Sequence, residues 1–178
     1  MIDALDELLA GLERLEAHQG LGVALIGGLA RGVWARPRAT MDVDVLVDTT
    51  DLEALVEAAP QAGLTTNDKE VATLRGSGMT RLRIPTHPTG PVRLDVLSAD
   101  HPYYQRVIAR AVRTTVLGHE VPVACAEDIV VLKVLADRLQ DRADVEAILQ
   151  SQGDRIRWAI IEEECAALDL TPPQPQPS

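Results

Sequence analysis

The chain has 178 residues, of which 46% are apolar, enough for one α/β domain with a small helical extension and a real hydrophobic core. Aromatic residues make up only 2% and Phe is absent, which excludes recognition of bases by rows of stacked aromatic rings. The formal net charge of −10 argues against general nucleic-acid binding, because attraction to phosphate dominates non-specific affinity.

The charge is spread unevenly along the chain. Between residues 71 and 113, seven arginines stand against two aspartates, so this segment carries +5 and the rest of the chain −15. A local basic face of this kind can seat a triphosphate or an RNA end. The same arginines are equally compatible with an ordinary strand and helix surface.

Neither the cysteines nor the hydropathy indicate secretion or a membrane. Cys125 and Cys165 are far apart and have no CxxC spacing or nearby histidine pair, so no zinc site or disulfide framework follows. The N-terminal residues are acidic, unlike a signal peptide, and no apolar run approaches the roughly 20 residues that cross a bilayer. We therefore expect a cytoplasmic protein that makes no membrane contact.

The first third of the chain alternates helical and strand patterns. Residues 2–18 carry apolar side chains at helical spacing and predict an amphipathic helix. The apolar run 23–26 predicts a buried strand that stops at Gly27-Gly28, and helical character follows over residues 29–35. Alternating valines predict a strand over 42–47, and Thr50-Asp51 then precedes a helix over 52–59.

The rest of the chain contains more strands and then a run of helices. Strands are predicted over residues 71–74, 80–84 and 92–97, and as a hairpin over 114–117 and 121–123. A Pro/Gly-rich turn (Pro85, Pro88, Gly90, Pro91) separates two of them. Helices are predicted over residues 103–112, 127–139, 141–150 and 154–168.

This order predicts an α/β (α+β) fold, in which helices flank a mixed sheet and a helical cluster ends the chain. We expect residues 1–123 to form the α/β core and residues 124–170 a helical part packed on it. Residues 171–178 are rich in Pro and Gln and predict a disordered tail.

Three carboxylates and a glycine pair carry the candidate chemistry. Asp42 and Asp44 are two apart on a predicted strand, so their side chains share a face, and a Mg²⁺ ion between them would relieve their repulsion. An isolated Asp-x-Asp is also common at a solvated strand edge. Asp95, however, lies in a predicted central strand, where an acid is costly unless it is paired or bound to metal. With Gly27-Gly28 as a close-approach turn before a helix N-terminus, these residues outline a two-metal phosphoryl-transfer site.

The segments 26–30 and 37–47 resemble the signature of the DNA-polymerase-β-like nucleotidyltransferase superfamily. The fuller resemblance is to its small bacterial members, the AbiEii-type toxin and related minimal nucleotidyltransferases, which share a Gly-Gly turn, a helix, an Arg-x-Thr lead-in and an Asp-x-Asp pair. The stretch 126–145, with Lys133, Arg138, Asp141 and Asp144, is similar to them as well.

The resemblance implies a metal-dependent enzyme that moves a nucleoside monophosphate from an NTP to an acceptor hydroxyl, with an RNA end, tRNA first, as the acceptor. It implies Mg²⁺ as the cofactor in a two-metal site, with Mn²⁺ as a substitute, and a toxin–antitoxin setting with a cognate antitoxin or toxin as partner. Asp95 would complete the second metal site and help to deprotonate the acceptor. The implied metal-binding and catalytic residues are Asp42, Asp44 and Asp95, and the implied nucleotide-binding residues are Gly27, Gly28, Arg38, Thr40 and Lys133.

One departure leaves alternatives open. Leu29 follows Gly28, where many members of the superfamily have a serine that contacts phosphate. The alternatives are AMP transfer to a protein hydroxyl, as in small antitoxin nucleotidyltransferases, an aminoglycoside-type adenylyl transfer, and a non-catalytic binding module that holds a partner through its acidic helices. A purely structural metal-binding domain would require the three acids to coincide by chance.

Overall fold

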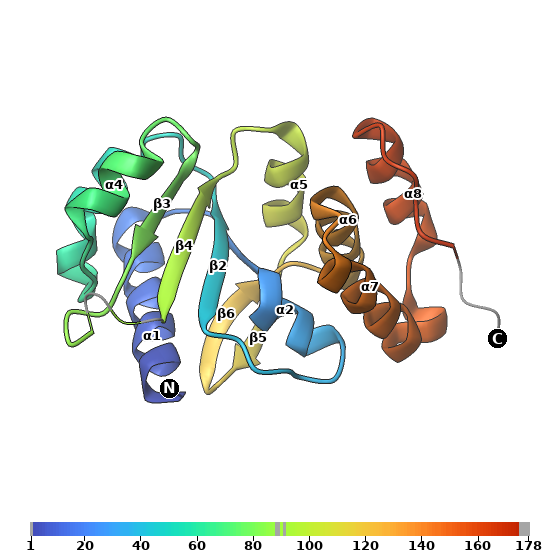
Figure 1. Cartoon of the computed structure of the whole chain (residues 1–178), viewed down its shortest axis with the longest axis horizontal. Coiled ribbons are helices and arrows are strands. Elements are labelled where there is room, and N and C mark those ends of the chain that lie inside the picture. The colour runs from blue at the N-terminus through green and yellow to red at the C-terminus, as the bar shows by residue number, and fades with distance from the viewer. Residues whose placement is uncertain (1, 88–89, 91, 175–178) are drawn as a thin grey trace.

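The structure of this chain is a computed structural model, and it describes residues 2–87, 90 and 92–174. One mixed sheet organises this part of the chain. Its strands lie in the order β3-β4-β2-β1-β6-β5 (Figure 1). The strands are β1 (Val23–Ile26), β2 (Asp42–Val47), β3 (Met79–Leu82), β4 (Arg93–Ser98), β5 (Val112–Val116) and β6 (His119–Val123). The pairs β2–β4 and β1–β6 are parallel, whereas β1–β2, β3–β4 and β5–β6 are antiparallel.

Helices cover this sheet and extend it to one side. They are α1 (Ile2–Gln19), α2 (Gly27–Trp34), α3 (Leu52–Ala58), α4 (Asp68–Leu74), α5 (Pro102–Arg110), α6 (Ala126–Ala136), α7 (Leu139–Gln152) and α8 (Trp158–Ala167). In Figure 1, α1 lies behind the sheet and α2 in front of it, α4 flanks the β3 edge, and α6, α7 and α8 gather at the opposite end of the molecule. The prediction of a mixed sheet flanked by helices, with a helical cluster at the C-terminal end, is confirmed.

Aliphatic side chains build the core, as the near-absence of aromatic residues requires. Leu8, Leu9 and Leu12 of α1 are at most 1% exposed, and the valines of β2 and β4 are equally buried. Each fully buried leucine contributes roughly 1.5–3 kcal/mol through removal of apolar surface from water. Over the described residues, no helix combines the length and the apolar content that a membrane crossing needs.

One predicted strand is wrong. Residues 71–74 lie in α4, because the Asn67 side chain accepts hydrogen bonds from the backbone N–H groups of Lys69 and Glu70 and so caps a helix. The glycine pair also lies inside the first turn of α2 instead of before the helix.

Parts of two other predicted segments are not covered by the structure. In the predicted turn over 85–91, Pro88 and Pro91 lie outside the described residues. In the predicted tail, residues 171–174 form neither helix nor strand, and residues 175–178 lie outside the described part.

His119, in β6, joins the β5–β6 hairpin to α1. Its ring atoms Nδ1 and Nε2 lie 2.9 Å from Glu13 Oε2 and 3.0 Å from Asp6 Oδ1. Hydrogen bonds that the ring donates to Glu13 and Asp6 raise the pKa of His119, and burial opposes this effect. A ring that donates to both carboxylates must be protonated, so this junction is strongest at mildly acidic pH.

We therefore expect His119→Gln to lower the free energy of unfolding by about 0.5–1 kcal/mol near pH 5.5, the range for largely exposed ion pairs, and by less at pH 9. Because the folded-state pKa is raised, the contribution is complete below the unfolded pKa and is lost as the pH rises through the folded one. Urea denaturation at both pH values measures the difference, with His18→Gln at the exposed end of α1 as control. An equal loss at both pH values would contradict the assignment.

Candidate active site

The parallel pairing of β2 with β4 brings the predicted acids together. In this register Asp44 is opposite Asp95 and Asp42 is opposite Arg93, so all four side chains lie on the same face of the sheet. The antiparallel strand β3 then places Arg81 opposite Asp95. The result is a charged surface across three adjacent strands, built from segments that are separated by up to about 50 residues in the sequence.

Gly27 and Gly28 allow the start of α2 to lie directly against this surface. Gly27 has φ +67°, and a Cβ atom built there would come within 2.0 Å of Asp44 Oδ2. A Cβ atom at Gly28 would come within 2.9 Å of Thr40 Oγ1. The two glycines therefore permit an approach that side chains would block, and they bring the first turn of a helix to the acids. Leu29 packs against the hydrophobic core, so the next position offers no hydroxyl.

Asp44 is the least compensated of the three acids. Burial raises its pKa to about 6, and the neighbouring Asp95 and Asp42 carboxylates add to the shift. The charge of Lys133 and the backbone N–H of Gly28 act in the opposite direction. Asp44 makes no ion pair with any residue that the structure describes. Its carboxylate thus lies among like charges at a site where a cation would be favourable.

Arginines neutralise the other two acids. Arg81 holds Asp95 with both ends of its guanidinium, Nε 2.6 Å from Oδ1 and Nη2 3.0 Å from Oδ2. Arg93 bridges the pair, with Nη2 3.0 Å from Asp42 Oδ2 and Nε 3.4 Å from Asp95 Oδ2. The second oxygen of Asp42, Oδ1, is buried and has no hydrogen-bond partner among the described residues. The sequence showed these arginines only as part of a basic segment, because their role follows from the strand register.

The acids suit a divalent cation, but not in the arrangement that they adopt here. Across residues 2–87, 90 and 92–174, no three His, Cys, Asp or Glu side chains are grouped as metal ligands, and Asp95 is engaged by Arg81 on both oxygens. The donor set nevertheless consists of hard carboxylate oxygens, which Mg²⁺ prefers. The unpaired Asp44 and the unpartnered Oδ1 of Asp42 supply open ligand atoms. The residues therefore fit the implied metal.

Lys133 lies close to the acids but is itself held by carboxylates. It is 7% exposed, and its Nζ lies 2.7 Å from Asp141 Oδ1 and 2.9 Å from Asp144 Oδ2, both on α7. Arg38 lies 3.2 Å from Asp144 Oδ2, and Arg31 Nε lies 3.1 Å from Asp144 Oδ1. The predicted nucleotide-binding residues Lys133 and Arg38 thus belong to one buried ionic cluster at the junction of α2, α6 and α7. The roles of Arg31, Asp141 and Asp144 could not be predicted from the sequence, because their proximity depends on helix packing.

The basic segment does not form an open basic surface. Each of its seven arginines makes an ion pair with a carboxylate. Arg106 and Arg110 both bind Glu164 of α8, and Arg110 also binds Asp128 of α6. The positive charge of this segment therefore serves mainly to join elements of the fold.

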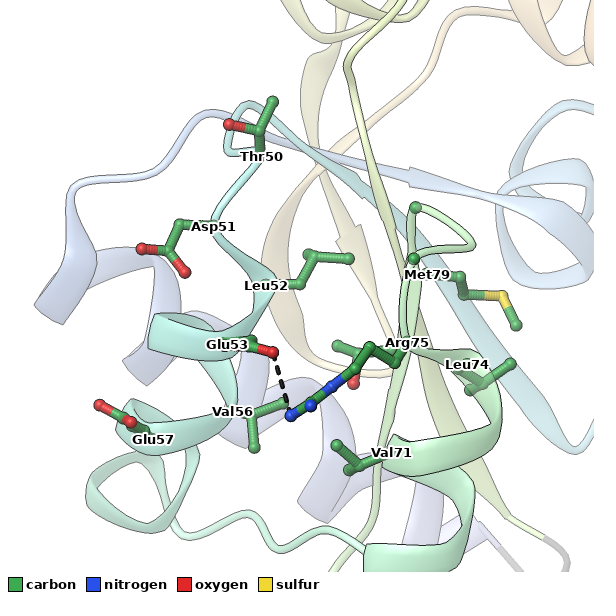
Figure 2. A pocket seen from close by; sticks show the side chains of 13 residues that line it. Thr50, Asp51, Leu52, Glu53, Val56, Glu57, Val71, Leu74, Arg75 and Met79 are labelled. Carbon is green, nitrogen blue, oxygen red and sulfur yellow. Dashed lines mark ion pairs between the residues drawn. The ribbon is translucent and has the colours of Figure 1, made fainter.

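One cavity lies away from the acids. It has a volume of about 620 Å³ and is lined by α3, α4 and the start of β3. Figure 2 shows Leu52, Val56 and Val71 along it and the ion pair of Arg75 with Glu53 across it. Thr50, beyond the C-terminal end of β2, lines this cavity, whereas Asp42 and Asp44 lie at the other end of that strand. The three acids therefore lie outside this cavity, on a part of the sheet face where Asp95 is buried and Asp42 and Asp44 are partly buried.

The fold is that of the nucleotidyltransferase class. The antibiotic-resistance factor ANT(2'')-Ia, in complex with adenylyl-2''-tobramycin, superposes with a TM-score of 0.55 at 16% identity, over 90% of this chain and 98% of that one. The lincosamide antibiotic adenylyltransferase LnuA, bound to lincomycin, gives a TM-score of 0.53 at 15% identity, over 80% of this chain and 94% of that one. Identities this low show the fold alone.

The family is shown by the sequence. The model of the family described as nucleotidyl transferase AbiEii toxin, type IV toxin–antitoxin system, matches residues 7–174. This chain belongs to the AbiEii nucleotidyl transferase toxin family and is a nucleotidyltransferase, as the resemblance implied. No curated protein matches its sequence significantly.

The contact between Gly27 and Asp44 predicts a large effect of one methyl group. We expect Gly27→Ala to lower the free energy of unfolding by about 1–3 kcal/mol, because a non-glycine residue at positive φ is strained, and to weaken nucleotide binding by displacing Asp44. Gly32→Ala in the same helix is the matched control, since its Cβ atom would meet nothing closer than 3.7 Å. Urea denaturation and nucleotide titration measure both effects. Equal behaviour of the two variants would contradict the close packing of Gly27 against Asp44.

The crowding of the acids predicts that Asp44 destabilises the metal-free protein. Its folded-state pKa is raised to about 6, so ionisation of Asp44 costs stability as the pH rises from about 4 to 6. We expect Asp44→Asn to raise the free energy of unfolding by about 1–3 kcal/mol at pH 8 and to leave it nearly unchanged at pH 4. Urea denaturation in EDTA measures this, with Asp154→Asn on an exposed turn as control. A loss of stability at pH 8 would show that Asp44 is not under repulsion.

Proposed function

We propose that this chain transfers a nucleoside monophosphate from an NTP to an acceptor hydroxyl, using Mg²⁺ or Mn²⁺ held by Asp42, Asp44 and Asp95. The observation that carries the proposal is the position of Asp44, which makes no ion pair with a described residue and lies beside Asp42 and Asp95 and against Gly27. Nucleotidyl transfer follows from the family, and the metal and the residue roles are our additions. We also propose that the reaction takes place in the cytoplasm, where NTPs are supplied.

The protein's own groups would mainly position the substrates. When bound, the metal would supply charge neutralisation for the triphosphate and lower the pKa of the acceptor hydroxyl. Gly27 and Gly28 let the first turn of α2 approach the phosphates, where its backbone N–H groups favour anions. Asp95 would accept the proton of the attacking hydroxyl. Such preorganised electrostatics account for most of the rate enhancement in phosphoryl transfer.

The ionic cluster around Lys133 would set the other side of the nucleotide site. Lys133 lies close enough to Asp44 to lower its pKa, and an ammonium group has three donors, of which Asp141 and Asp144 use two. The third donor is available for a phosphate oxygen. Arg38, 34% exposed at its side chain, and Thr40, beside Gly28, would contact the nucleotide or steady the Asp42–Asp44 segment.

As acceptor we propose an RNA end, with tRNA first, and as partner a cognate antitoxin. The toxin description of the family supports a target among the cell's own molecules. The charged surface on β2, β3 and β4 lies outside the cavity of Figure 2. The side chains of Arg81, Arg93 and Asp42 are 21%, 31% and 32% exposed, so this surface reaches solvent, which suits a macromolecular acceptor. A protein hydroxyl and an aminoglycoside are the rival acceptors.

The metal site is tested by nucleotide binding. We expect Mg²⁺ to strengthen ATP binding by the wild type, and Asp42→Asn or Asp44→Asn to reduce nucleotidyl transfer by about 100-fold or more, the scale for loss of one preorganised charge-stabilising group. Isothermal titration and a transfer assay measure the two quantities, and Asp154→Asn serves as the control. Equal binding of Mg-ATP by the wild type and by both variants would remove the metal site from the proposal.

The acceptor is tested separately. The enzyme is incubated with each of the four labelled NTPs and with total RNA, lysate protein or an aminoglycoside. Label in the tRNA fraction that depends on Asp44 supports the RNA proposal. Label confined to protein or to the aminoglycoside would replace that acceptor and leave the transfer reaction intact.

A further inference from the structure

Two arginines occupy the oxygens that a metal would need. Arg81 takes both oxygens of Asp95, and Arg93 contacts Asp42 Oδ2 and Asp95 Oδ2. Together they place two positive charges among three acids. Carboxylates this close would repel strongly without them, so these arginines keep the metal-free site folded in its present arrangement.

A guanidinium group and a metal ion compete for the same carboxylate oxygens, so each weakens the binding of the other. The side chains of Arg81 and Arg93 are 21% and 31% exposed, so both reach solvent and have room to turn. Arg83, by contrast, is 7% exposed and is held by two hydrogen bonds to Glu70 and one to the Gly90 carbonyl. Its position is fixed, and it contacts none of the three acids among its described partners.

The partners of Arg81 also show where it can go. Its Nη1 lies 3.4 Å from Glu70 Oε1 on α4, longer than its contacts with Asp95. Glu70 already binds Arg83 at 2.6 Å, so it is a weak alternative partner for Arg81. An arginine that leaves Asp95 therefore needs a new anion, and its fork geometry matches phosphate oxygens well.

We propose that Arg81 and Arg93 are exchangeable counter-ions: they neutralise Asp95 and Asp42 in the metal-free protein and move to the phosphate oxygens of the nucleotide when the cation binds. This inference rests on the proposed function and adds a coupling to it. The cation alone binds weakly, because two guanidinium groups lose their partners. The triphosphate gives them new ones, so cation and nucleotide strengthen each other's binding by the same factor.

The experiment measures Mn²⁺ affinity by titration with paramagnetic detection, with and without a non-hydrolysable ATP analogue. We expect Arg81→Gln to tighten binding of Mn²⁺ alone by about 5- to 30-fold and to reduce the enhancement by the nucleotide correspondingly, within the usual range of coupling factors. Arg93→Gln should act in the same direction. Arg81→Lys, which keeps the charge but not the fork, should fall between wild type and Arg81→Gln.

Arg75→Gln is the matched control, because Arg75 pairs with Glu53 on the surface, away from the acids. Circular dichroism confirms that each variant is folded, and Arg81→Lys preserves the test if Arg81→Gln is not. If Mn²⁺ alone binds Arg81→Gln and Arg81→Lys no tighter than the wild type, while Asp44→Asn still abolishes binding, the exchange is wrong and the proposed function stands. If the wild type binds Mn²⁺ with the nucleotide no better than Asp44→Asn does, the proposed function itself fails.

Discussion

The in-register parallel pairing of β2 with β4 is the constraint on which the site depends. It sets Asp44 beside Asp95 and Asp42 beside Arg93, and a shift by one residue would send every one of these side chains to the opposite face. The register is fixed by the valines and leucines between the acids, since Val43, Val45, Leu94 and Val96 are fully buried. Core packing on one face of the sheet thus determines the geometry of the acids on the other.

Electrostatic repulsion between neighbouring carboxylates costs free energy, and the acids differ in how far basic side chains neutralise them. Asp95 and Asp42 are neutralised by arginines from β3 and β4, and Asp144 and Asp141 by a lysine and arginines from α2, α6 and the adjoining loops. Asp44 makes no ion pair with a described residue, and burial together with the neighbouring carboxylates raises its pKa. Such local strain in electrostatics is typical of functional sites. It also explains why the three acids do not form a ready metal cluster in the metal-free protein.

Local sequence patterns predicted part of this account and tertiary contacts determined the rest. Asp42 and Asp44 share a face because strands have a period of two, and Gly27-Gly28 marks a close approach whatever the fold. The pairing of Arg81 with Asp95 depends on the register between strands, and the ion pairs of Lys133 with α7 depend on helix packing. Neither could be predicted from the spacing of residues in the sequence. The apolar residues of 71–74 suggested a strand, but the Asn67 cap started a helix before them. The basic segment predicted an open phosphate-binding surface, whereas all its arginines form ion pairs with carboxylates in the structure.

The central claim is that the carboxylates of residues 42, 44 and 95 bind one substrate-associated cation together. A crystal soaked with Mn²⁺ and a non-hydrolysable ATP analogue tests it most directly, through the anomalous signal of manganese. We expect a peak within coordination distance of oxygens from all three residues, with the triphosphate against the first turn of α2. Two results would contradict the account. One is bound nucleotide with manganese remote from these oxygens, and the other is bound nucleotide with both oxygens of Asp95 still paired with Arg81.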